Sequence, residues 1–340
     1  MATIGFDGSS LRKYSHGLVT WLTVLFLMVG IPSVWAEDAD MAHGETPGVN
    51  EPVGNWKFRT DKPVKVVVIG GSVSAYTGGN FGDFLGNVCR NVEIVNRGKA
   101  RYGAWALKQR FVAQVLKNRG IKLTDKAIQH WVIFQGGLNS VGTPEKTNKD
   151  LRELFVTAYN AGVRVVGLSL SPWGAEADKK RWSKTAGLKY KQYTQKVVDY
   201  VMGRLTPADA FGTYVERDRS LGWAEGELPT IAVDLYASGL RDKDAPLRNE
   251  KTVEKWVEQD TEIKKRLKSL PADEAVKEKQ RIVDELRRIP QWFLRREYHA
   301  FDHIHPNREG HRIIAQTLCP KLPADWGCDC EALGTVNPLR

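Results

Sequence analysis

The stretch Val64-Lys65-Val66-Val67-Val68-Ile69-Gly70-Gly71-Ser72 decides the fold. Its apolar and largely β-branched run predicts a strand that is buried on both faces and ends at the two glycines. Such strands are typical of parallel sheets covered by helices. Ser72 therefore follows the carboxyl end of the strand, where open α/β sheets bind ligands.

Four more apolar runs predict strands, over residues 92–95, 131–134, 163–170 and 231–235. Helical spacing of apolar residues lies between several of them, at 81–88, 105–117 and 149–160. This alternation of strands and helices predicts an α/β fold with five parallel strands covered on both sides. Asn139 follows the third strand and should share an edge of the sheet with Ser72.

A highly charged stretch, about 247–298, follows the fifth strand. Two sets of apolar residues at helical spacing, separated by Pro271, predict an inserted helical hairpin. The sets are Val253, Trp256, Val257, Ile263, Leu267 and Leu270, then Val276, Ile282, Val283, Leu286, Ile289 and Phe293. Two interpretations are open: a surface helix pair that covers the domain, or a lid or wall of a substrate site.

The sequence Asp302-His303-Ile304-His305-Pro306 follows this insertion. A serine hydroxyl becomes a nucleophile when an imidazole takes its proton and a carboxylate orients that imidazole. Ser72, His305 and Asp302 supply these three groups if the fold joins them, which predicts acyl transfer. The alternative is a metal site of Asp302, His303 and His305. Pro306 and the helical pattern after it favour a loop, so we expect no metal.

Four short blocks, in the correct order from Val64 to Ala315, resemble those of the SGNH hydrolases, also called the GDSL family. The first has Gly71 in place of an acidic residue, and the third has Ser140 in place of an aspartate. The blocks are Gly70-Gly71-Ser72-Val73, Asn96-Arg97-Gly98, Gly137-Leu138-Asn139-Ser140 and Asp302 to His311.

The resemblance implies a flavodoxin-like three-layer α/β/α sandwich and a serine esterase that needs no cofactor. It implies Ser72 as nucleophile, His305 as base and Asp302 as its orienting acid. The Ser72 and Gly103 backbone N–H groups and the Asn139 side chain would bind the oxyanion, with Gly98 as an alternative to Gly103.

The first 36 residues have the pattern of a secretory signal. Arg12 and Lys13 precede an apolar run, helix breakers follow it, and cleavage is expected after Ala36. We expect export to the periplasm or outside the cell; an uncleaved anchor is the alternative and would be the chain's only membrane contact. The expected organisation continues with a flexible leader at 37–60, a hydrolase-like domain at 61–320 and a cysteine-containing tail at 321–340.

The chain has four cysteines, Cys89, Cys319, Cys328 and Cys330. An even number in an exported chain predicts disulfides. A bond between Cys328 and Cys330 would be strained, so we expect Cys89 to pair within the C-terminal group. The Cys-x-Cys spacing does not match the usual zinc pattern.

The formal net charge is +10, and removal of the signal leaves about +9. No block rich in Lys and Arg and no nucleic-acid motif accompanies this charge, so we expect no nucleic-acid partner. The expected partner is an ester substrate, with an acylated polysaccharide as the candidate suggested by Tyr76, Trp173, Trp182 and Trp292. An O-acyltransferase acting on polysaccharide and a non-catalytic binding or scaffold protein are the alternative functions.

Overall fold

The computed structural model describes residues 50–214 and 222–338. The predicted signal segment and residues 37–49 of the predicted leader lie outside the described residues. Among the helices of the described part, none combines the length and the apolar character needed to cross a bilayer.

Five parallel strands form one sheet in the order β2-β1-β3-β4-β5. They are β1 (Val64–Gly70), β2 (Val92–Asn96), β3 (Gln129–Gln135), β4 (Arg164–Leu168) and β5 (Ile231–Val233). The predicted parallel sheet is therefore confirmed, and its order is the flavodoxin-like one. The connections reverse direction between β1 and β3, so the loops after these two strands diverge and leave room for a site.

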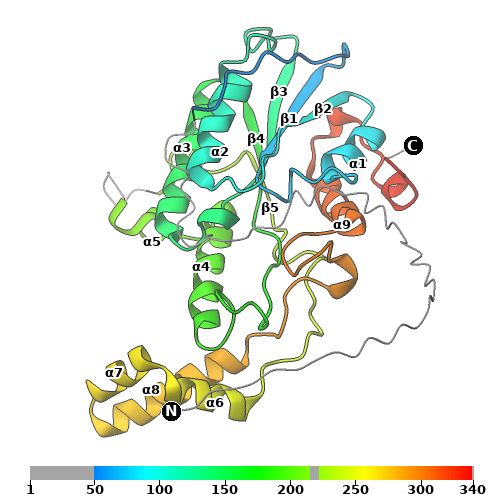
Figure 1. Ribbon diagram of the computed structural model, residues 1–340. Coiled ribbons are helices and arrows are strands. Elements are labelled where there is room, and N and C mark those ends of the chain that lie inside the picture. The colour runs from blue at the N-terminus through cyan, green and yellow to red at the C-terminus, as the bar shows by residue number, and fades with distance from the viewer. Residues whose placement is uncertain (1–49, 215–221, 339–340) are drawn as a thin grey trace, which may run out of the picture. The chain divides into compact units, whose positions relative to one another are not determined.

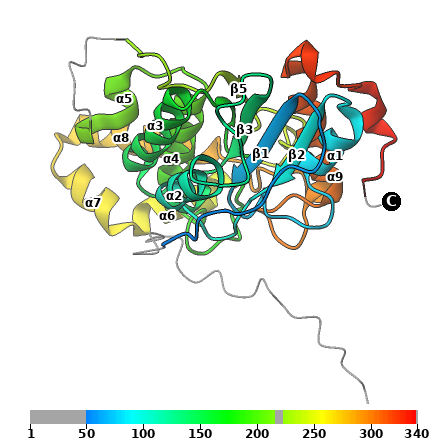
Figure 2. The ribbon, with the colours of Figure 1, turned by 90° about the horizontal axis from the view of Figure 1, so that it is seen from above.

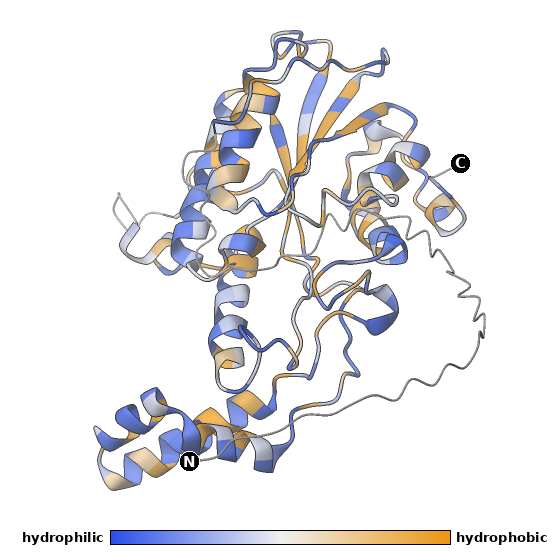
Figure 3. Ribbon diagram, in the orientation of Figure 1, coloured by the Kyte–Doolittle hydropathy of each residue, from blue (hydrophilic) through white to orange (hydrophobic). Residues whose placement is uncertain are grey.

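Helices cover both faces of the sheet, which gives the predicted three layers (Figures 1 and 2). One layer contains α2 (Ala104–Phe111), α3 (Pro144–Asn160) and α4 (Ala186–Val201), and the other contains α1 (Phe81–Val88) and α9 (Arg308–Leu318). Alternate residues of β1 enter the two cores, with Val67 and Ile69 in the first and Val66 and Val68 in the second. The strands are mainly apolar, with polar residues such as those at the two ends of β3, whereas the helices carry apolar and polar stripes (Figure 3).

Several short elements complete the domain. The predicted continuous helix at 105–117 ends as α2 at Phe111 and continues as a π-helical turn, Val112–Leu116. A short helix, α5 (Pro207–Phe211), follows α4. The remaining turns are 3-10 helices, at Leu138–Ser140, Gly212–Tyr214, Arg296–Tyr298, Cys319–Lys321, Ala324–Trp326 and Glu331–Gly334.

The insertion contains three helices where the apolar spacing predicts two arms. They are α6 (Glu250–Gln259), α7 (Thr261–Lys268) and α8 (Ala272–Arg287). The first arm divides at Asp260, whose carboxylate accepts hydrogen bonds from the backbone N–H groups of Glu262 and Ile263, both at 2.9 Å. This carboxylate caps a new helix and so ends the previous one.

The insertion is joined to the domain by buried contacts at its base. Val253, Val257, Ile282, Val283 and Leu286 belong to the same core as α4. The predicted stripe is not uniform, because Val276 is 70% exposed, and Ile289 and Phe293 are buried beyond the end of α8. The base of the insertion is therefore fixed on the domain, and its far end projects away from the sheet (Figure 1).

Two disulfides tie the C-terminal tail to the domain. Cys89, which directly follows α1, is bonded to Cys328, and Cys319, which directly follows α9, is bonded to Cys330. The expectation that Cys89 pairs with the C-terminal group is met. The tail therefore links the two helices that cover one face of the sheet.

Candidate active site

Ser72 lies in a tight turn directly after β1. Gly71 accepts a hydrogen bond from the Ala75 N–H at 3.0 Å, which closes the turn. A Cβ on Gly70 would lie 2.2 Å from the Ser74 hydroxyl oxygen and 2.3 Å from the Gln135 carbonyl oxygen. Only glycine fits there, and this close approach holds the Ser72 turn against the end of β3.

The second half of the site is the loop of residues 299–307. His299 pairs with Pro306 in an antiparallel bridge, and the Ala300 N–H donates to the His305 carbonyl oxygen at 2.9 Å. Asn307 caps α9 by accepting from the Gly310 N–H at 3.0 Å, and its amide also donates to the His299 carbonyl oxygen at 3.1 Å. The loop is thus fixed at both ends.

The fold joins Ser72, His305 and Asp302 in one chain of hydrogen bonds. The Ser72 Oγ lies 2.8 Å from His305 Nε2, and His305 Nδ1 lies 2.9 Å from Asp302 Oδ2. The other carboxylate oxygen accepts from the backbone N–H groups of Ile304 and His305, both at 2.8 Å. Burial alone would raise the pKa of Asp302, but these hydrogen bonds lower it below its ordinary value. Asp302 therefore stays ionised and acts as an acceptor.

Phe301 stacks on the His305 imidazole, and a second imidazole, that of His311, is buried in α9. Phe301, which is 57% exposed, stacks on His305 with ring centroids 4.9 Å apart. His311, in the first turns of α9, stacks on Tyr76 at 4.7 Å and is fully buried. Burial, with a smaller electrostatic effect of the nearby His305 ring, lowers the pKa of His311 to about 3, so His311 remains neutral. Of the two imidazoles, His305 and His311, His305 is therefore the one that is placed to exchange a proton.

The predicted oxyanion donors lie around the same turn. The Asn139 side-chain amide donates one hydrogen bond to the Tyr102 carbonyl oxygen at 3.2 Å, and its nitrogen lies 3.9 Å from where a Cβ on Gly71 would be. Gly103 follows Tyr102 and is the N-cap of α2. The Gly98 N–H instead donates to Asn96 Oδ1 at 2.9 Å, which makes Gly103 the better candidate.

Of the two residues that differ from the SGNH pattern, Ser140 has a structural role, whereas nothing in the structure requires glycine at 71. The Ser140 hydroxyl, in place of an aspartate, accepts from the Ala104 N–H at 3.0 Å and so holds the start of α2 beside Gly103. A Cβ on Gly71 would make only ordinary contacts, the nearest at 3.7 Å to the Tyr102 carbonyl oxygen. With glycine at position 71, the turn is still formed and the Ser72 hydroxyl keeps its position.

The alternative metal site requires Asp302, His303 and His305 to face one point. Instead, both ring nitrogens of His305 have partners, while His303 Nε2 lies 3.4 Å from Asp178 Oδ2. Within residues 50–214 and 222–338, no group of three or more His, Cys, Asp and Glu side chains could hold a metal ion.

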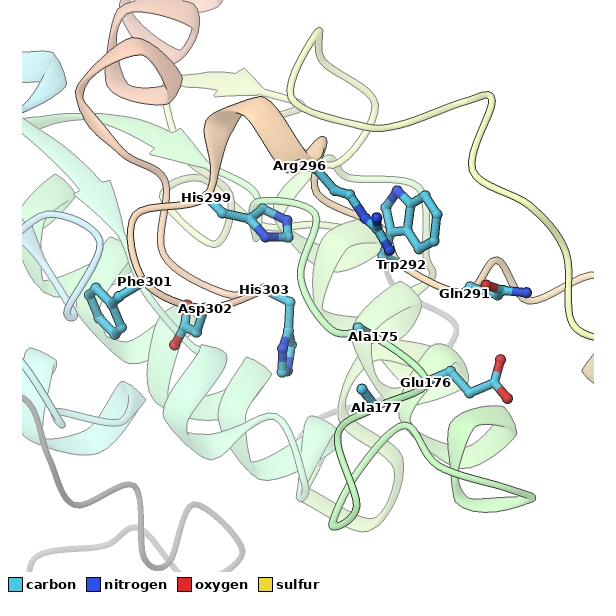
Figure 4. A pocket seen from close by; sticks show the side chains of 10 residues that line it. All are labelled: Ala175, Glu176, Ala177, Gln291, Trp292, Arg296, His299, Phe301, Asp302 and His303. Atoms are coloured by element: carbon cyan, nitrogen blue, oxygen red, sulfur yellow. The ribbon is translucent and has the colours of Figure 1, made fainter.

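A cavity of about 850 Å³ opens beside Asp302 (Figure 4). Its walls come from the segment after β4 and from the segment between α8 and α9. Trp292 and Arg296 lie against each other at one end, with 3.8 Å between the guanidinium carbon and the ring centre, and Phe301 lies at the other end. The lining residues are Ala175, Glu176, Ala177, Gln291, Trp292, Arg296, His299, Phe301, Asp302 and His303.

The aromatic residues suggested by the sequence have different positions. Trp173 and Trp182 are 0% exposed and pack against each other in the core, so they cannot contact a substrate. Tyr76 packs on His311. Of the four, Trp292 alone lines the cavity described here, and its ring nitrogen donates to Asp242 at 2.6 Å. Sequence reasoning missed Glu176 and Arg296, which carry no motif.

Comparisons with known proteins find likeness in structure. No family model and no curated protein matches the sequence. The structure is similar to an acetylxylan esterase from Geobacillus stearothermophilus, at 13% identity and a TM-score of 0.39, over 82% of this chain and 97% of that one. It is also similar to a GDSL-like lipase from Bacteroides thetaiotaomicron, at 14% identity and a TM-score of 0.42, over 77% and 89%.

A third similar structure is described as a putative lipolytic protein of the G-D-S-L family from Desulfitobacterium hafniense. It has 15% identity and a TM-score of 0.42, over 76% of this chain and 99% of that one. At these identities and TM-scores the likeness carries no functional argument of its own.

Proposed function

We propose that this chain is an SGNH-type serine hydrolase that cleaves carboxylic esters through an acyl-serine intermediate. The observation that carries the proposal is the continuous hydrogen-bonded series Ser72, His305 and Asp302, assembled from segments 233 residues apart in sequence. A nucleophile, a base and an acid that orients the base form the arrangement required for acyl transfer.

In the proposed reaction, Ser72 Oγ attacks the ester carbonyl carbon while His305 Nε2 takes the hydroxyl proton. The tetrahedral intermediate collapses with cleavage of the ester C–O bond, and His305 gives that proton to the leaving alkoxide. A water molecule then attacks the acyl-serine, loses a proton to His305, and releases the acid. The proton returns to Ser72 Oγ, and Asp302 holds the ring in register throughout.

Removal of the Asn139 amide should mainly lower turnover. This side chain and the backbone N–H groups of Ser72 and Gly103 would donate to the oxyanion, which exists only in the transition state and intermediate. We expect Asn139→Ala to lower kcat by roughly 10² to 10³ with a small change in KM. Steady-state kinetics on a short acyl ester measure this, and an unchanged kcat would contradict the role.

A fluorophosphonate probe tests the function itself. It forms a covalent bond only with an activated serine, so wild-type protein should be labelled at Ser72, and mass spectrometry should locate the label there. Ser72→Ala should remain unlabelled. A non-catalytic binding or scaffold protein would leave both proteins unlabelled, which would refute the proposal.

We further propose that the substrate is an acylated polysaccharide met after export. The cavity beside Asp302 combines two aromatic rings with polar groups that can bind hydroxyls, and its acidic and basic residues include Glu176 and Arg296. A neutral sugar suits such a mixed surface better than a long acyl chain, which needs an apolar one. The two disulfides support an oxidising location outside the cytoplasm.

Trp292 provides the test of this substrate class. We expect Trp292→Ala to lower kcat/KM on an acetylated oligosaccharide by roughly tenfold, because a flat ring contact worth about 1 to 2 kcal/mol is lost. The rate on p-nitrophenyl acetate should change by less than roughly twofold, since this ester does not need the cavity. An equal loss on both substrates would refute the sugar assignment.

A further inference from the structure

The segment of residues 51–58, here named the N-terminal strap, lies across the loop that carries the oxyanion candidates. The Gly54 N–H donates to the Ala113 carbonyl oxygen at 2.9 Å, and the Gln114 amide donates to the Pro52 carbonyl oxygen at 2.9 Å. The sequence assigns this segment to a flexible leader. These contacts instead attach it to the π-helical turn that follows α2.

The Glu51 side chain makes several polar contacts with the domain. Its side chain is only 6% exposed and forms an ion pair with Arg110 on α2. It also accepts from the Tyr102 hydroxyl at 2.9 Å and from the Gln114 amide at 3.3 Å. A buried carboxylate with three donors is a strong attachment point, because charged hydrogen bonds are stronger than neutral ones.

Tyr102 connects this carboxylate to the oxyanion candidates. Its hydroxyl donates to Glu51, its carbonyl oxygen accepts from the Asn139 amide at 3.2 Å, and the next residue is Gly103. Burial and the hydrogen bond to Glu51 raise the pKa of Tyr102, so the phenol stays protonated and keeps donating. One amide hydrogen of Asn139 is used by Tyr102, which fixes the direction of the other.

The loop from Arg97 to Tyr102 needs such support from outside. Arg101 has φ of 68°, a left-handed conformation that is unfavourable for a residue with a side chain and persists only where contacts enforce it. The strap contacts both ends of this loop: Trp56 packs on the Arg97 guanidinium at 4.6 Å, and Glu51 binds Tyr102.

We infer that Glu51 and Tyr102 are positioning residues, through which the N-terminal strap sets the orientation of Asn139 and Gly103 in the oxyanion site. This inference rests on the proposed esterase function. Neither residue needs to touch the substrate. A strap that is displaced would allow Tyr102 to move, and a misplacement of about 1 Å at a reacting centre can lower the rate by roughly 10²-fold.

The decisive experiment is a double-mutant cycle. Tyr102→Phe removes the hydroxyl that binds Glu51 but keeps the carbonyl oxygen that binds Asn139. We expect it to lower kcat roughly tenfold with KM within about twofold, because the affected interaction acts in the transition state. In an Asn139→Ala background, Tyr102→Phe should lower kcat by only about twofold. The Asn139 amide that Tyr102 positions is already absent there, so the two effects are not additive.

Glu51→Ala should repeat the effect of Tyr102→Phe, and Thr60→Val supplies the matched control. Thr60 is exposed and its hydroxyl donates to Glu93 at 2.8 Å, so it attaches the same leader at a point beyond the strap. Thr60→Val should keep wild-type kcat. Unchanged kcat in Tyr102→Phe, or an equal loss with and without Asn139, would overturn the inference.

A second readout does not depend on turnover. In protein labelled with ¹⁵N at asparagine, the Asn139 side-chain signals are identified by their loss in Asn139→Ala. These signals should shift in Tyr102→Phe and Glu51→Ala but not in Thr60→Val. If wild-type protein neither hydrolyses esters nor reacts with a fluorophosphonate, the proposed function fails. The NMR result then still decides whether the strap positions Asn139: unshifted signals would overturn the inference.

Discussion

Ser72→Ala is expected to lower kcat on ester substrates by roughly 10⁶, the loss typical when a catalytic serine is removed. The reason is chemical: His305 can still accept a proton, but no hydroxyl remains within 2.8 Å of its Nε2 to donate one and form the acyl bond. The effect should appear in kcat, with substrate binding retained. Active-site titration and steady-state kinetics on p-nitrophenyl acetate measure it.

The loss in Ser72→Ala should be specific to this hydroxyl. Ser269 provides a matched control, because it is exposed, ends α7, and donates only to a nearby backbone carbonyl at 2.7 Å. Ser269→Ala should keep wild-type kcat. If Ser72→Ala retained more than about one thousandth of the activity, a different nucleophile would have to be sought.

Asp302→Asn is expected to lower kcat by roughly 10⁴. The two backbone N–H groups of Ile304 and His305 donate to Asp302 Oδ1, so an asparagine must place its oxygen there. Its NH₂ group then faces His305 Nδ1, which must become the acceptor. The proton of the neutral ring moves to Nε2, and the nitrogen that faces Ser72 can no longer take the hydroxyl proton.

The folded structure of this variant should be unchanged, because asparagine has almost the shape of aspartate. Asp329→Asn, an exposed substitution that keeps a hydrogen bond to the Ala332 N–H, serves as the control for the chemical change and should be fully active. NMR of the His305 ring can report which nitrogen carries the proton. A variant with less than a tenfold loss would show that Asp302 does not orient the base.

The parts of the fold that the sequence predicts are those in which local pattern and tertiary environment agree. β1 is apolar apart from Lys65 because both of its faces are buried, and Gly70, the last residue of the strand, is required by the close approach to Gln135. The loop of residues 299–307 is predictable for a similar reason, since Asp302 and His305 are near neighbours in sequence and also hydrogen-bonded partners.

Other elements escape prediction because their signals are weak or ambiguous. α4 receives no assignment, because Gly187 and Thr194 occupy two positions of its buried face and interrupt the apolar stripe. No apolar residue lies between Val257 and Ile263, because the chain ends one helix there and starts another at Asp260. Glu51 lies in a stretch rich in Pro, Gly and charged residues. A single buried side chain in such a stretch produces no periodicity from which its burial could be predicted.

The two disulfides also determine what a cut in the chain can do. From Ser72 the backbone runs through α1 to Cys89, crosses to Cys328, and returns through α9 to His305. A protease that cleaves anywhere between Cys89 and Asp302 therefore leaves Ser72 and His305 on one covalently connected body. In an oxidising compartment, the nicked protein would keep the segments that carry Ser72 and His305 tethered until the disulfides are reduced.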